Sequence, residues 1–201
     1  MKIFLNLFIN KYMSLELEKY RYEKKFVIEN RFNFLINHYV KSNPLMFAKQ
    51  FNNRTIDTIY FDNDNLDLYK QNIDGLNERK KIRIRWYPNT SNFVTPILEI
   101  KIKKGNLGEK IRYFLEPISK DSTNVAQNIL NSILKVKFES KLNELIYSFK
   151  PILLVRYNRE YFLSRISKCR LTVDKNIKFY KISANKINNN YRRYKNTLIE
   201  L

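Results

Sequence analysis

The sequence has little cysteine and no long apolar run. Its only cysteine, Cys169, excludes an internal disulfide and leaves a reducing, cytoplasmic setting as the expectation. No apolar stretch approaches the length of a membrane span. The opening MKIFLNLFIN has a short apolar core, but Asn6 interrupts it and no small-residue cleavage site follows. Residues 1–18 are therefore interpreted as an N-terminal extension, with Met13 as an alternative start.

Acidic residues are also scarce, with 19 Asp and Glu against 38 Lys and Arg, for a formal charge of +19. Such an excess of one sign repels itself and costs stability. It indicates a polyanionic partner: nucleic acid, an anionic membrane or a phosphate-rich small molecule. An AT-rich genome would also raise the Lys count, although it explains the Arg residues less well. The 44% of hydrophobic residues excludes a disordered chain, and 201 residues suffice for one domain with a sizeable core.

Alternation of apolar and polar residues predicts strands along most of the chain. Helical spacing instead predicts flanking helices over about 30–41 and 121–149. Residues 185–196, NKINNNYRRYKN, are predicted to form a polar loop. The fold class is α+β. The predicted strands are 19–28, 54–62, 79–87, 96–104, 107–116, 152–164, 169–174, 177–182 and 197–201.

The strand KKIRIRWY, residues 80–87, places three cations on one face. Lys81, Arg83 and Arg85 alternate there with apolar residues on the other face, and LEIKIKK and EKIRYF repeat the pattern. An open sheet whose ionic face lies in water would show the same alternation. A sheet closed into a barrel would instead turn the cations into a lumen, where phosphate oxygens would have to fill the space. Arginine suits that task because its planar fork takes two phosphate oxygens at once.

An ordered set of segments carries a family resemblance over about residues 20–201. The segments are RYEKKF, DTIYFDNDNLDLYKQNIDG, KIRIRWY, ILEIK, GEKIRY, VRYNRE, CRLTVD and TLIEL. Together they resemble the VTC domain, the polyphosphate polymerase domain of the CYTH-like triphosphate tunnel metalloenzymes. The resemblance implies a closed antiparallel β-barrel of about eight strands that forms a tunnel. It also implies ATP and inorganic polyphosphate as partners, Mn²⁺ or Mg²⁺ as cofactor, and no nucleic acid.

The resemblance also assigns residues to roles. Glu200 on the last strand would hold the metal, and Glu23 and Glu99 are weaker candidates, either as metal ligands or as ion-pair partners. No protein nucleophile is implied, so catalysis would consist of positioning and charge neutralisation. The residues implied to hold phosphate oxygens are Lys25, Arg83, Arg85, Lys101, Lys110, Arg159 and Arg170. Of these, the implied catalytic ones are Arg83, Arg85, Lys101, Arg159 and Arg170.

We therefore expect one domain over residues 19–201 that ends just after Glu200, without the C-terminal helix of family members. The expected function is synthesis of polyphosphate from the terminal phosphate of ATP. The alternatives are a triphosphate hydrolase, a polyphosphate-binding or triphosphate-binding module with little catalysis and, third, a nucleic-acid binder. Against the last, the sequence contains no helix-turn-helix, zinc finger or aromatic RNA motif. Trp86 and most of the Tyr and Phe residues are predicted to lie in the core outside the barrel.

Overall fold

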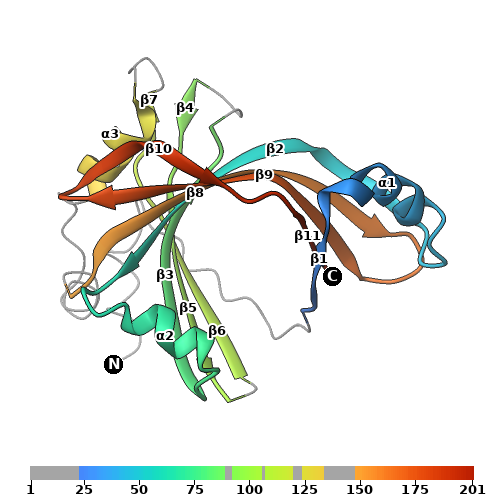
Figure 1. Cartoon of the computed structure of the whole chain (residues 1–201), viewed down its shortest axis with the longest axis horizontal. Coiled ribbons are helices and arrows are strands. Elements are labelled where there is room, and N and C mark those ends of the chain that lie inside the picture. Colours follow the sequence, from blue (N-terminus) through green and yellow to red (C-terminus); the bar gives the residue numbers. More distant parts are fainter. Residues whose placement is uncertain (1–22, 89–91, 106, 120–123, 134–147) are drawn as a thin grey trace, which may run out of the picture.

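The computed structural model describes residues 23–88, 92–105, 107–119, 124–133 and 148–201. The predicted N-terminal extension, 1–18, lies outside the described residues, as do residues 121–123 and 134–147 of the second predicted helix. Within the described part, a large antiparallel sheet is accompanied by three α-helices (Figure 1). The predicted α+β class is confirmed.

Two sheets form in the described residues, one of nine strands and one of two. The large sheet contains β1 (Lys25–Ile28), β2 (Phe47–Asp62), β3 (Glu78–Trp86), β5 (Ile97–Lys104), β6 (Leu107–Phe114), β8 (Lys150–Ser164), β9 (Arg170–Ser183), β10 (Lys186–Arg193) and β11 (Thr197–Glu200). The small sheet pairs β4 (Phe93–Val94) with β7 (Ile118–Ser119). The helices are η1 (Asn30–Phe32), α1 (Asn33–Lys41), α2 (Asp67–Ile73) and α3 (Val125–Ile133).

The large sheet is antiparallel throughout and strongly curved. Its strand order is β1-β11-β9-β8-β2-β3-β5-β6, and β10 pairs with β9 outside that path. In Figure 1 the strands β3, β5 and β6 descend on one side of an arch and β1 and β11 on the other. An ion pair of 3.6 Å joins Glu23, just before β1, to Lys101 of β5. No pairing between β1 and β6 closes the sheet in the described part, so a closed barrel stays a prediction.

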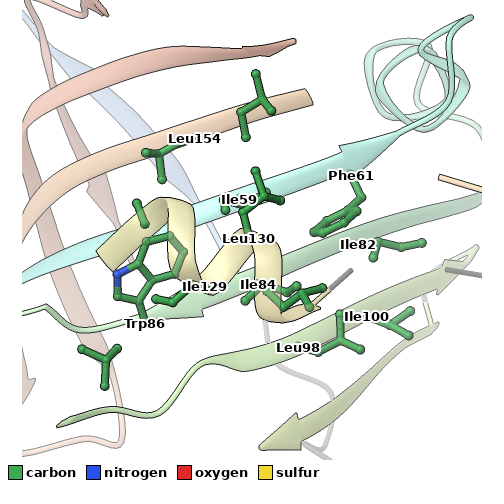
Figure 2. Close-up of a cluster of buried hydrophobic side chains, with 14 of the residues drawn as sticks. Ile59, Phe61, Ile82, Ile84, Trp86, Leu98, Ile100, Ile129, Leu130 and Leu154 are labelled. Carbon is green, nitrogen blue, oxygen red and sulfur yellow. The ribbon is translucent and has the colours of Figure 1, made fainter. Parts of the chain in front are cut away.

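The outer, convex face of the sheet carries the main core. Ile82, Ile84 and Trp86 alternate along β3 and are almost completely buried. The helix α3 covers them with Ile129 and Leu130, as Figure 2 shows. Alternation along the strand sends the neighbouring cations to the other face. The same burial that stabilises the fold therefore fixes which way the arginines of β3 point.

The segment predicted as a polar loop, 185–196, is largely a strand. Residues 186–193 form β10 and pair antiparallel with β9. Ala184 and Asn185 make the connecting turn with left-handed φ angles of 47° and 58°. The prediction was wrong because this strand lies at an edge and is mostly exposed, so its backbone pairing needs no apolar face. Its asparagines gave no alternating pattern to detect.

Other boundaries differ by a few residues. The strand β2 begins at Phe47 rather than at residue 54, and the two predicted strands over 169–182 are one strand, β9. The hairpin predicted around Gly105 is confirmed, and Gly105 has a φ of 58° that suits glycine. None of the helices in the described ranges is long and apolar enough to cross a membrane.

Two Ile→Ala substitutions, one in the outer core and one on the surface, should differ greatly in their effect on the free energy of unfolding. Ile84→Ala removes a fully buried side chain beneath α3 and should lower the free energy of unfolding by about 3 kcal/mol. Ile166→Ala truncates a side chain that is 63% exposed and should change it by less than about 0.5 kcal/mol. Urea unfolding measures both, and equal losses in the two variants would contradict this account of the core.

Candidate functional site

The concave face of the sheet gathers the cations that the sequence places opposite the core. Cross-strand partners point to the same side of a sheet, and Arg83 is the partner of both Tyr60 on β2 and Glu99 on β5. We call this surface the inner face. By register it carries Lys25, Thr58, Tyr60, Lys81, Arg83, Arg85, Glu99, Lys101, Lys110, Arg112, Tyr157, Arg159, Thr172, Asp174 and Glu200.

One buried carboxylate, Glu99, organises the cations of β3 and β6. Its side chain is only 4% exposed. Arg83 Nε donates to Glu99 Oε2 at 2.6 Å, and Lys110 Nζ lies 3.0 Å from Oε1. Arg112 and Arg85 approach at 3.4 and 3.7 Å. Burial by itself raises the pKa of the Glu99 carboxyl, but the charges of Arg83, Arg85 and Lys110 outweigh burial and hold it well below its ordinary value.

A second carboxylate, Asp174, holds Arg159 in place. The guanidinium donates from Nε and Nη2 to the two Asp174 oxygens, at 2.6 Å each, in the fork geometry of strong arginine–carboxylate pairs. Glu200 Oε2 lies 3.6 Å from Arg159 Nη2. Burial lowers the pKa of Arg159, yet the bonds to Asp174 raise it overall, so this side chain stays a cation. Its position on the inner face is thereby fixed before any ligand binds.

A third group consists of Lys25 on β1 and Glu23 just before that strand. Lys25 Nζ lies 2.9 Å from Glu23 Oε1, and Lys25 is the cross-strand partner of Glu200. Burial raises the pKa of the Glu23 carboxyl, but Lys25 and then Lys101 lower it to about 2. For Lys81 the balance is the opposite: burial and then the nearby charge of Lys25 lower its pKa overall, although Tyr60 acts to raise it.

Six of the seven residues predicted to bind phosphate therefore lie together on the inner face. They are Lys25, Arg83, Arg85, Lys101, Lys110 and Arg159. The seventh, Arg170, lies at the exposed start of β9, two residues before Thr172, where its cross-strand partner is Leu163. Their phosphate-binding roles stay predictions.

Tyrosines on the inner face were missed by the sequence interpretation. Trp86 lies in the outer core as predicted, but Tyr60, Tyr157 and Tyr161 lie on the inner face. Burial raises the pKa of Tyr60, and the charges of Arg83 and Arg85 lower it overall. Alternation along the strand would have identified two of them, because Tyr157 and Tyr161 lie two residues before and after Arg159 and therefore point to the same face as this arginine.

Several buried polar atoms on the inner face have no hydrogen-bond partner within the described part of the chain. They are Thr58 Oγ1, Arg85 Nε and Thr172 Oγ1. Thr58 and Arg85 are direct cross-strand partners. A buried donor without a partner costs about 1–3 kcal/mol, so such groups call for an explanation. A bound oxyanion would satisfy the Arg85 donor.

The three predicted metal ligands do not form one cluster. No group of three or more Asp, Glu, His or Cys side chains suited to a metal occurs among the described residues. Glu99 is already surrounded by cations, which suits the ion-pair role that was its alternative. Glu200 and Glu23 flank Lys25, and one or two carboxylates plus substrate phosphates are how Mg²⁺ is usually held in proteins. The residues present thus fit a metal shared with a phosphate ligand.

Glu99 makes stability depend on pH. The pKa of its carboxyl is lower in the folded chain than the ordinary 4.5, so its stabilising contribution is complete above that value and is lost as the pH falls. Between pH 5 and 3, the unfolding free energy of the unaltered chain should fall more steeply than that of Glu99→Gln, by up to about 1.4 kcal/mol per pH unit.

At pH 7, Glu99→Gln should itself be about 3 kcal/mol less stable, because four cations lose their buried counter-charge. The matched control is Glu29→Gln, whose side chain is 59% exposed. Its unfolding free energy should follow that of the unaltered chain at every pH. Parallel pH curves for all three proteins would overturn the role given to Glu99.

Comparison with known proteins places the chain in a family. The model of the VTC domain matches residues 20–201. No protein of curated function matches. Among solved structures, a candidate adenylate cyclase of Bacillus halodurans has 17% identity and a TM-score of 0.49, and the Hippeastrum protein HpAC1, described as having a dominant triphosphatase activity, has 12% and 0.42. Each alignment covers 89% of this chain and 77% of the other. By its match over residues 20–201, the chain belongs to the VTC domain family.

Proposed function

We propose that this protein is a metal-dependent phosphoryltransferase that builds inorganic polyphosphate from the terminal phosphate of ATP. The observation that carries the proposal is the inner face, where arginines and lysines from five strands, β1, β3, β5, β6 and β8, lie on the same concave side of the sheet (Figure 1). The VTC family to which the chain belongs supports a triphosphate as the ligand. A chain of phosphates matches that surface because it carries a negative charge on every unit.

The arginines are the groups that we propose to position the reacting phosphates. Arg83 and Arg159 are each held by a carboxylate, so they are oriented in advance and their positioning costs little at the moment of reaction. Arg85 is held less tightly, 3.7 Å from Glu99, and its Nε has no partner among the described residues. We infer that Arg85 donates to an oxygen of the transferred phosphoryl group. The acceptor phosphate attacks directly, and no side chain forms a covalent intermediate.

The lysines would neutralise the remaining negative charge of the bound phosphates. Lys101 and Lys110 are cross-strand partners, and Lys81 faces Lys101 from β3. Such a cluster repels itself in the absence of an anion, as the lowered pKa of Lys81 indicates: burial and then Lys25 disfavour its charged form. Bound phosphates remove that repulsion. The pKa of Lys81 should therefore rise when a triphosphate binds.

Mn²⁺ or Mg²⁺, held by Glu200 with Glu23 nearby, would supply charge neutralisation at the phosphate oxygens. Glu200 also touches Arg159, which places this carboxylate next to a proposed phosphate-binding arginine. Glu23 contacts Lys25 of β1 through one carboxylate oxygen and Lys101 of β5 through the other. These carboxylates thus orient cations of the chain as well as the metal.

A substitution of Arg85 tests the proposed activity. Purified chain is incubated with ATP and Mn²⁺, and ADP, free phosphate and long-chain polyphosphate are followed together. Arg85→Gln should lower turnover by about 100-fold or more, because a donor aimed at the transferred group is lost. The control Arg31→Gln removes an equal charge from a side chain that is 70% exposed, and it should keep full activity.

The products of that assay separate the candidate functions. Polyphosphate together with ADP supports the polymerase. Free phosphate without polymer would assign a triphosphate hydrolase instead. Binding of triphosphate without turnover would leave a binding module, and absence of binding would return the arginines to a solvated surface.

Metal dependence gives an independent test of the acidic residues. Chelation should abolish turnover of the unaltered chain while tripolyphosphate still binds to the cations. Glu200→Gln should raise the Mn²⁺ concentration for half-maximal turnover by about tenfold, because one carboxylate ligand is lost. Glu29→Gln should leave that concentration unchanged. An unaltered Mn²⁺ requirement in Glu200→Gln would remove Glu200 from the metal site.

A further inference from the structure

One end of the inner face carries an aromatic cluster that phosphate binding does not explain. The guanidinium carbon of Arg54 lies 4.9 Å from the ring centre of Phe51, 5.6 Å from that of Tyr87 and 5.5 Å from that of Tyr161. Phe51 and Tyr161 also meet edge to face, with ring centres 5.8 Å apart. We call these four residues the aromatic platform.

The register places the platform on the inner face, next to the proposed phosphate-binding arginines. Arg54 is the cross-strand partner of Arg159, and Phe51 is the partner of Tyr161. Tyr161 follows Arg159 by two residues on β8, so both side chains point to the same side. Tyr87 likewise stands two residues beyond Arg85, about 7 Å along the chain.

One ring of the platform, Phe51, is exposed, whereas Arg54, Tyr87 and Tyr161 are partly buried and hold it in place. Phe51 is 44% exposed although its ring contacts both Tyr161 and Arg54. Burial, followed by the neighbouring Tyr87, raises the pKa of the Tyr161 phenol to about 12, so its ring stays neutral at physiological pH. Exposed ring faces and arginine planes on a basic surface are the groups on which nucleobases stack.

We propose that the aromatic platform seats the base of a nucleoside triphosphate whose phosphates lie on Arg85 and Arg159. The inference rests on the proposed function and adds the place and direction of the nucleotide. Inorganic polyphosphate has no ring, so the combination of rings and cations selects a nucleoside phosphate at this end. The opposite end of the face presents lysines, including Lys101 and Lys110, which suit a bare phosphate chain. Stacking tolerates any base, so discrimination among ATP, GTP and CTP should be weak.

Binding of ATP compared with inorganic tripolyphosphate tests the inference, by calorimetry on the full chain. The variant Phe51→Leu keeps apolar volume and charge but removes one ring. It should weaken ATP about tenfold and change tripolyphosphate less than twofold. The matched control is Phe34→Leu, on α1, where the ring is 76% exposed, and both ligands should bind it as they bind the unaltered chain.

A second pair of variants tests the cation of the platform. Arg54→Gln should weaken ATP more than tripolyphosphate. Arg31→Gln removes an arginine stacked in the same way, 4.7 Å from the ring centre of Phe32, and should affect neither ligand.

The outcomes distinguish this inference from the proposed function. If the unaltered chain binds tripolyphosphate as tightly as ATP, and Phe51→Leu changes neither affinity, the platform does not bind the base. Only this inference then fails. Equal weakening of both ligands in Phe51→Leu would also overturn it, by assigning the ring to the architecture of the face. If the chain binds neither ligand, the proposed function fails too. If Phe51→Leu weakens a single-stranded oligoadenylate more than ATP, the platform belongs to a nucleic-acid site instead.

Discussion

The rest of the inner face depends on the burial of Glu99 among cations. Without a counter-charge, Arg83, Arg85 and the cations of β6 would repel one another strongly, because their side chains are only 12–24% exposed to water. Glu99 contacts all of them from the centre of β5, with its own side chain nearly inaccessible. One carboxylate cannot neutralise four cations, so the face stays strongly positive. Its arginines are therefore oriented by the fold, while most of their charge remains available to an anion.

The other carboxylates also pair with cations, but they differ from Glu99 in the number of cations that they contact and in how exposed they are. Asp174 takes both of its hydrogen bonds from Arg159 and fixes one arginine firmly. Glu23 and Glu200 surround Lys25 at the edge strand β1, where both side chains are more exposed than Glu99. The acidic side chains on this surface thus range from buried and fully paired with cations to partly exposed. All of them orient cations, and only the more exposed Glu23 and Glu200 are also proposed to hold a metal.

Much of the fold was predictable because alternation along a strand is a local property. The rows of β3 and β5 gave the outer core and the basic inner face before any contact was known, and Trp86 lies where its position in the row requires. The edge strand β10 was missed because backbone pairing to β9 stabilises it without a buried face. The tyrosines were missed because aromatic residues suggest core wherever they occur. The second predicted helix is confirmed over Val125–Ile133, while residues 148 and 149 are not helical.

The sequence by itself determined the class of fold, the positive charge of the inner face and most of the charged residues on it, because the alternation of charged and apolar residues is a property of each strand separately. Only the tertiary structure decided which charges meet. The curvature of the sheet brings Glu23 before β1 to Lys101 on β5, and the register of β2 against β8 sets Arg54 beside Tyr161. Residues so far apart in the chain are joined by cross-strand pairing and sheet curvature, and neither is encoded in the pattern of any single strand.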